Sequence, residues 1–156
     1  MNSIPALTIE NVASLDGILG DFLQKADADL TVLIDRGGNV ISQFGDVSAM
    51  DVTIIAALAA GSFAATAELA RRIGEVEFNA LYHQGNGNHI FMNSIDDNTI
   101  MITVFGPRST VGLVRFYSIA TAQAVAEFLK SLDPSAGHGF HFDAADVTAS
   151  PIFVDR

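Results

Sequence analysis

The stretch DVTIIAALAAGSFAATAELARRIGE, residues 51–75, decides how the rest of the chain is interpreted. Residues 52–67 carry no charge, alanine is the commonest residue, and Gly61 lies in the middle. The spacing of apolar residues predicts a helix over residues 51–74, with Gly74 as its C-terminal stop. Three interpretations are open: a membrane span, an ordinary core helix, or a surface that another molecule covers.

A membrane span is the weakest of the three. The uncharged run is shorter than the roughly 20 residues that a helix needs to cross a bilayer, and alanine contributes little insertion energy. The N-terminal sequence MNSIPALTIENVASL lacks a basic region, an apolar run and a cleavage site, so we expect no signal peptide. The helix is therefore predicted to belong to a soluble fold, with no membrane insertion.

Composition narrows the function classes further. A chain of 156 residues, 49% of them hydrophobic, fits one compact domain with a real core. The absence of cysteine excludes disulfides, thiolate zinc sites and thiol nucleophiles, and permits a reducing, cytoplasmic location. The formal net charge of -10 repels phosphate backbones and anionic lipid, so we expect no nucleic-acid partner.

The remaining elements follow from periodicity and turn residues. Apolar spacing predicts helices over residues 8–26 and about 110–132, and the turn DRGGN makes LTVLIDRGGNVISQFG a β-hairpin. Three more strands are predicted at residues 76–84, 89–95 and 99–106, joined by short polar turns. The order helix, two strands, helix, three strands, helix predicts an α+β sandwich with one five-stranded antiparallel sheet. Residues 133–156 are expected to form a flexible or loosely docked tail.

The helix at residues 51–74 carries more apolar surface than sheet packing requires. One stripe, predicted to face the sheet, comprises Val52, Ile55, Ala59, Phe63, Ala70 and Ile73. A second, on an adjacent side, comprises Ile54, Leu58, Gly61, Ala65 and Leu69, with Ala56, Ala57, Ala60 and Ala64 between and beside the two. Small side chains let another backbone come close, and the charges that resume at Glu68, Arg71, Arg72 and Glu75 would form a polar rim. The alternative is a core large enough to bury the whole helix.

Self-association is the simplest way to cover the second stripe. A two-fold axis beside the helix would bring the same smooth surface from two chains together. If the strand after the helix lies at the sheet edge, its unpaired backbone is also available to pair with its symmetry mate. We therefore expect a homodimer.

Catalytic and metal-binding signals are weak. His83 and His89 flank a turn, but no third ligand is evident, so the turn-flanking interpretation is favoured over a zinc site. His138 and His141 lie in the predicted tail. The motifs of P-loops, serine hydrolases and zinc proteases are missing. We expect no enzymatic activity, no cofactor and no metal.

Two turn arginines and one acidic pair have a structural and a functional interpretation. Arg36 and Arg108 each lie in or beside a turn, where they are either solvated or positioned as charged contacts to a partner. Asp96 and Asp97 are adjacent in sequence, so they are expected to build a turn rather than a paired-carboxylate site.

Three blocks of sequence together resemble a known family. VLIDRGGNVISQFG, AALAAGSFAATAELARRIGE and LYHQGNGNHIFMNSIDDNTIMITVFGPRSTVGLVRF are similar, in this order, to the Roadblock family of longin-like dimeric domains. The alanine-rich helix and the HQG turn look closest to its bacterial MglB branch. The resemblance covers about residues 8–131 and implies that residues 1–132 form one Roadblock-like domain.

The resemblance also implies a function. Members of the MglB branch form homodimers through the second helix and the following strand, bind a small Ras-like GTPase, and stimulate hydrolysis by remodelling its switch loops without an arginine finger. The alternative is a dimerising, tethering module that leaves GTP hydrolysis unchanged. The implied partner-binding residues are Ala57, Ala60, Gly61, Ala64, Ala65, Glu68, Arg71 and Arg72, and the implied dimer interface comprises Ile54, Leu58, Leu69, Val76, Phe78 and Ala80. A role in cell polarity or motility rests on the same likeness.

Overall fold

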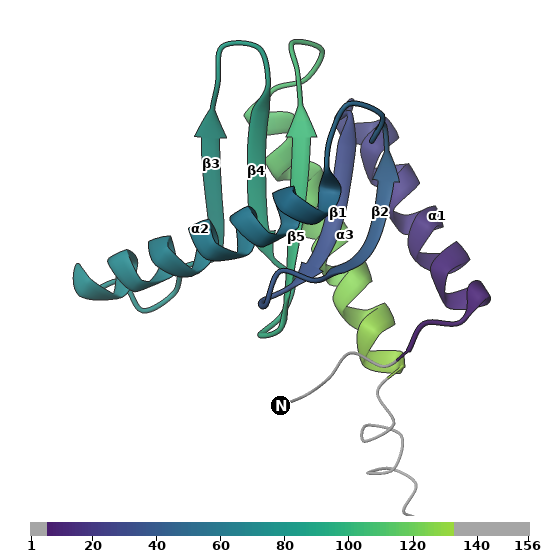
Figure 1. The fold of residues 1–156 in the computed structure, drawn as a ribbon, viewed down its shortest axis with the longest axis horizontal. Coiled ribbons are helices and arrows are strands. Elements are labelled where there is room, and N and C mark those ends of the chain that lie inside the picture. Colours follow the sequence, from purple (N-terminus) through teal and green to yellow (C-terminus); the bar gives the residue numbers. More distant parts are fainter. Residues whose placement is uncertain (1–5, 133–156) are drawn as a thin grey trace, which may run out of the picture.

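The computed structural model describes residues 6–132 and confirms the predicted order of elements (Figure 1). The elements are α1 (Ile9–Ala26), β1 (Leu30–Asp35), β2 (Val40–Gly45), α2 (Val52–Arg72), β3 (Ala80–Gln84), β4 (His89–Ser94), β5 (Thr99–Phe105) and α3 (Val111–Ser131). The predicted tail at residues 133–156, with His138 and His141, lies outside the described residues.

Local sequence signals account for where the helices begin and end. Thr8, Asp51 and Thr110 are the N-caps of α1, α2 and α3, and the side chain of each accepts a hydrogen bond from the backbone N–H three residues later, at 3.1 to 3.3 Å. After α2, Gly74 has a φ of 89°, which glycine adopts without strain. The predicted C-terminal stop of α2 is confirmed.

The five strands form one antiparallel sheet in the order β2-β1-β5-β4-β3. β5 and nearly all of β1, which lie inside the sheet, are buried, whereas β2 and β3 are the edges. The expectation that the strand after α2 lies at an edge is therefore confirmed. Its outer backbone groups have no neighbouring strand within the described part of the chain.

The sheet separates two apolar cores (Figure 1). α1 and α3 cover one face, where Leu19 and Phe22 of α1 and Val125 of α3 pack in the same cluster as Phe91 and Met101 of the sheet. α2 covers the other face alone and packs on the alternate residues of the same strands, which are Leu30, Val32, Ile34, Met92, Ile100, Ile102 and Val104. The two-residue period of a strand accounts for this division.

One strand is shorter than expected. β3 begins at Ala80, so Val76 to Asn79 precede it instead of belonging to it. Ala80 pairs with Asn93, and the last ladder contact is the N–H of Ser94 donating to the carbonyl of Asn79 at 2.8 Å. Beyond Ser94 the partner strand turns toward β5, so the residues before Asn79 have nothing to pair with.

Candidate partner interface

α2 packs on the sheet over only part of its surface. It crosses the strands, and its C-terminal turns project past the edge strand β3 (Figure 1). The residues of α2 that are buried are Ala56, Ala59, Ala60 and Phe63, the last of them near the middle of the helix. The second half therefore has much less sheet beneath it.

The second apolar stripe of α2 is exposed, as predicted. Ile54 is 55% exposed, Leu58 68% and Leu69 62%. The alternative in which a large core buries the whole helix is wrong for this chain as a single protomer. An exposed row of large apolar side chains of this kind marks an interaction surface.

The stripe assigned to the sheet needs one correction. The spacing predicts that Ile73 faces the sheet, but it is 78% exposed, and Val76 after it is 93% exposed. Both follow the projecting end of α2, where no strand lies below the helix (Figure 1). Ile73, one turn after Leu69, continues the exposed apolar row at the end of α2, and Val76 lies in the connection to β3.

The small residues assigned to partner binding divide into two groups. Ala57, Gly61, Ala64 and Ala65 are exposed, and a Cβ added to Gly61 would meet nothing within 4 Å. Ala60 is only 6% exposed, so its assignment to the accessible surface is wrong. Ala60 lies one turn after Ala56 on the buried side of the helix, where it packs with Phe63.

Charged residues border the C-terminal end of this small-residue surface. The Glu68 carboxylate forms ion pairs with Arg71 and with Arg72, the latter at 2.9 Å between Arg72 Nε and Glu68 Oε1. Hydrogen bonds from Arg72 and Arg71 lower the pKa of Glu68. Exposed pairs of this kind add little stability, and here they gather the three charged groups of the predicted rim at one end of α2.

The residues assigned to the dimer interface lie along α2 and the edge strand. Ile54, Leu58, Leu69 and Val76 are exposed, and so is Ala80 at the start of β3. Phe78 is half-buried because its ring packs on Phe63, with 4.8 Å between centroids. Its role in a dimer stays a prediction.

Sequence reasoning did not place the β1–β2 turn beside α2. A Cβ added to Gly38, whose φ is 90°, would lie 3.0 Å from the Cα of Ala57, so the turn touches the helix backbone. The guanidinium of Arg36 lies over the Phe63 ring. The only signal in the sequence is the pair of glycines in this turn, which permits a close backbone approach.

The two histidines of the β3–β4 hairpin do not converge. His83 pairs with Ile90 and His89 with Gln84, so the two rings point to opposite faces of the sheet. His89 is held by Tyr82, with 3.2 Å between the Tyr82 hydroxyl and His89 Nδ1. Within residues 6–132 no three potential ligands gather into a metal site.

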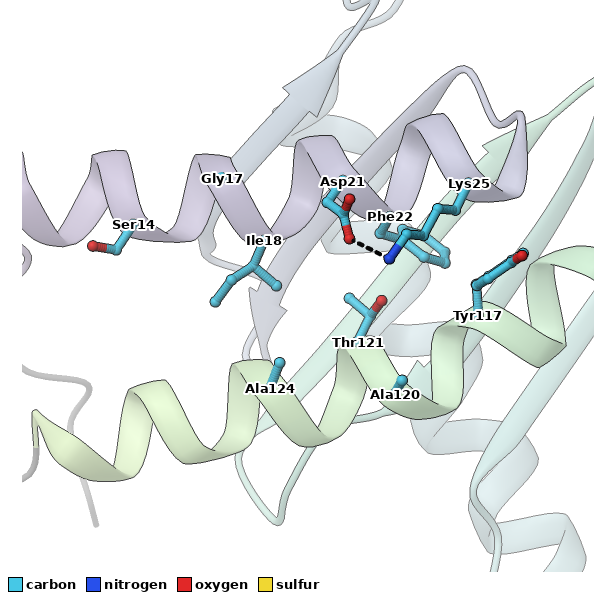
Figure 2. Close-up of a pocket in the computed structure, with 10 residues that line it drawn as sticks. All are labelled: Ser14, Gly17, Ile18, Asp21, Phe22, Lys25, Tyr117, Ala120, Thr121 and Ala124. Atoms are coloured by element: carbon cyan, nitrogen blue, oxygen red, sulfur yellow. Dashed lines mark ion pairs between the residues drawn. The ribbon is translucent and has the colours of Figure 1, made fainter.

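An open groove of about 670 Å³ lies between α1 and α3, on the face of the sheet opposite α2 (Figure 2). Small residues from both helices line it, among them Gly17, Ala120 and Ala124. Its two charged side chains, Asp21 and Lys25, pair with each other at 2.9 Å, and this hydrogen bond raises the pKa of Lys25. The groove therefore offers no uncompensated charge to a ligand.

By length and apolar composition α2 is the one described helix able to cross a bilayer. Only 28% of its most apolar window is buried. The buried part includes Phe63 and Ala59, which cover the core of the sheet. Insertion of α2 into a bilayer would remove these side chains from the sheet and expose the core beneath them. In its observed place, α2 keeps this packing and presents a second apolar face to the outside.

Comparison with known proteins identifies the fold. The chain is similar in structure to MglB of Myxococcus xanthus, with 27% sequence identity, a TM-score of 0.75, and coverage of 82% of this chain and 96% of that one. It is also similar to the gliding protein MglB of Thermus thermophilus, with 24% identity, a TM-score of 0.75, and coverage of 84% and 99%. A structure described as MglB with a tetrameric arrangement has 24% identity, a TM-score of 0.75, and coverage of 84% and 98%.

No curated protein matches the chain in a sequence search. The profile of the Roadblock/LC7 domain matches residues 15–105, which run from the middle of α1 to the end of β5 and include all of α2. This match spans more than half of the chain, so the chain belongs to the Roadblock/LC7 domain family.

Proposed function

We propose that this protein is a non-enzymatic, homodimeric regulator of a small Ras-like GTPase. The observation that carries the proposal is the exposed apolar and small-residue face of α2 in a Roadblock/LC7 chain similar to MglB. The likeness to MglB proteins extends the proposal to a cytoplasmic regulator in the control of cell polarity or motility.

The homodimer is supported by the projection of α2 past β3 (Figure 1). Pairing of β3 with β3 of a second copy would continue the sheet and place that copy's strands beneath the projecting turns. Leu69, Ile73 and Val76 would then be covered instead of meeting water. A single contact would thus provide hydrogen-bond partners for the outer backbone groups of β3 and bury the apolar side chains at the end of α2.

The GTPase surface is the remaining exposed side of α2. Ala57, Gly61, Ala64 and Ala65 are exposed and present no more than a methyl group each, so a partner's backbone can lie close to the helix at these positions. The ion-paired group of Glu68, Arg71 and Arg72 forms a polar rim around this apolar centre. An apolar centre with a polar rim is the usual anatomy of a protein interface.

We place this face against protein instead of lipid. A bilayer would have to take Phe63, Ala56 and Ala59 off the sheet before α2 could span it, exposing the core that they cover. A protein partner leaves that packing intact.

Regulation without catalytic residues requires differential binding. The dimer must hold one arrangement of the GTPase switch loops more tightly than the others. Each preference of about 1.4 kcal/mol shifts the population of the favoured arrangement tenfold. A small difference in contact with α2 is therefore sufficient for regulation.

The test is binding to a Ras-like GTPase from the same organism, purified and loaded with GDP or with a non-hydrolysable GTP analogue. Ala64→Arg places a large cation on the exposed side of α2 and should abolish binding while the fold stays intact. Gln123→Arg adds the same cation on the exposed side of α3, so it serves as the matched control and should bind normally. Unchanged affinity of Ala64→Arg would overturn the assignment of this surface.

The same exposed face also suits a tethering module that dimerises and links larger complexes. A hydrolysis assay with the same GTPase separates the two functions. A regulator changes the rate of GTP hydrolysis or nucleotide release, whereas a tether binds and leaves both rates unchanged.

A further inference from the structure

Arg36, in the turn between β1 and β2, is held in place along one edge of its guanidinium. Its Nε donates to the carbonyl of Asp97 at 2.8 Å. Its Nη2 donates to Ser94 Oγ at 2.9 Å and to the carbonyl of Asp96 at 3.1 Å. The Arg36 Cζ also lies 5.3 Å from the centre of the Phe63 ring, on the underside of α2.

The Nη1 group of this guanidinium makes no hydrogen bond within the described residues. Arginine has five N–H donors, and the three hydrogen bonds occupy Nε and Nη2. Within residues 6–132 the two donors of Nη1 have no acceptor, and Arg36 is exposed. Because the group is planar and one edge is fixed, Nη1 is presented in a set direction.

The charge of Arg36 is also not neutralised by a carboxylate in the described residues. Its acceptors are two carbonyls and one hydroxyl, which are uncharged. The other arginines near the helix or at turns behave differently: Arg71 and Arg72 pair with Glu68, and Arg108 pairs with Asp29 at 3.0 Å. Arg36 therefore has no direct ion-pair partner among the described residues, and the nearby Asp35, Asp96 and Asp97 contact it in no salt bridge.

Arg36 lies beside the surface proposed to bind the GTPase. Gly38 in the same turn touches Ala57 of α2. Ala57, Ala64 and Arg71 are seven residues apart, so they follow one line along the helix. The turn thus meets α2 at the beginning of the line that continues through Ala64.

We propose that Arg36 is a specificity-determining contact that takes a carboxylate from the bound GTPase. This inference rests on the proposed function and adds to it a cation outside α2. With Nε and Nη2 already engaged, Nη1 can donate a charge-assisted hydrogen bond to a carboxylate oxygen of the partner. A lysine ammonium would carry the same charge, but its flexible stem would not hold the donor in this direction. A partner that covers Arg36 without supplying an acceptor would leave the Nη1 donors unsatisfied, so the contact also selects against such partners.

The test compares Arg36→Ala, Arg36→Lys and the matched control Arg108→Ala, with the same purified GTPase, at low and at high salt. Arg36→Ala should weaken binding about tenfold or more at low salt, and the loss should shrink at high salt because an ion pair is screened. Arg36→Lys should recover the association rate but keep a faster dissociation rate. Arg108→Ala should bind like the unmodified chain.

Three results would overturn the inference. Unchanged affinity of Arg36→Ala, with binding still lost in Ala64→Arg, would leave the proposed function standing and remove this contact. An affinity loss that is equal at both salt concentrations and is not recovered in any part by Arg36→Lys would show that Arg36 acts only by holding the two turns together. Absence of binding by the unmodified chain would overturn the inference and the proposed function together.

Discussion

The guanidinium carbon of Arg36 lies 5.3 Å from the centre of the Phe63 ring. This contact joins the β1–β2 turn to the underside of α2, and Arg36 reaches from there to the β4–β5 turn. Three segments far apart in the sequence are thereby held as one unit. The exposed face of α2 consequently has a fixed orientation relative to the end of the sheet.

Phe63 is the side chain that fastens α2 to the sheet. It is fully buried and packs on Phe78, so Phe63→Ala should lower the free energy of unfolding by about 3 to 5 kcal/mol. Phe116→Ala, on the exposed side of α3, should change it by less than about 0.5 kcal/mol. Urea unfolding of both variants measures the difference, and equal effects would contradict the packing described.

Arginine substitutions at two neighbouring alanines of α2 should have opposite consequences. Ala60 is buried under the helix and has no room for a guanidinium, so Ala60→Arg should unfold or strongly destabilise the protein. Ala64 is exposed, so Ala64→Arg should keep the thermal midpoint within a few degrees. Circular dichroism on heating distinguishes the two, and a stable Ala60→Arg protein would disprove the orientation of α2.

Self-association should depend on the projecting end of α2. Leu69→Asp puts a charge into the proposed contact between copies and should convert the proposed dimer to monomer without unfolding it. Ile119→Asp, an equally accessible position on α3, is the control and should leave the proposed dimer intact. Analytical ultracentrifugation reads out the mass. A Leu69→Asp protein that remains dimeric would show that the interface does not include the end of α2.

Asp35, at the end of β1, should make the free energy of unfolding depend on pH. Burial raises the pKa of Asp35, but hydrogen bonds from Asn39 and from the backbone of Gly37 and Gly38 lower it by more, so the folded pKa is below the ordinary value. A lowered pKa contributes stability that is complete above about pH 3.9 and is lost as the pH falls through the folded value.

Asp35→Asn removes that contribution. The variant should be less stable than the unmodified protein by about 1 kcal/mol near neutral pH, and the difference should vanish in strong acid. Asp97→Asn, at an exposed turn, is the control for the loss of a surface carboxylate and should change the free energy of unfolding near neutral pH by less than about 0.5 kcal/mol. Urea unfolding at several pH values between neutral and strong acid measures the difference in free energy of unfolding between Asp35→Asn and the unmodified protein. A difference that increases as the pH falls would contradict the lowered pKa of Asp35.

Metal should not contribute to folding or stability. His83 and His89 point to opposite faces of the sheet, so one ion cannot bind both rings. We expect that a chelator leaves the thermal midpoint unchanged and that purified protein contains no stoichiometric zinc. A lower midpoint after chelation would point to ligands outside residues 6–132.

Much of the fold was predictable because its signals are local. The caps Thr8, Asp51 and Thr110, the glycine after α2 and the short polar turns between strands act over a few residues, so the order of helices and strands follows from them. The start of β3 was not predictable. It depends on where β4 ends, and that is a property of two strands together.

The sequence by itself determined that residues 52–67 form an uncharged helix with more apolar surface than one sheet contact can use, because side-chain identity and helical period are both local properties. Only the tertiary structure decided which small residues are accessible. It buried Ala60, exposed Ala64 and Ile73, and brought Arg36 against Phe63. The angle at which α2 crosses the sheet, and the length by which it passes β3, arise from packing between segments distant in sequence, and no periodicity encodes them.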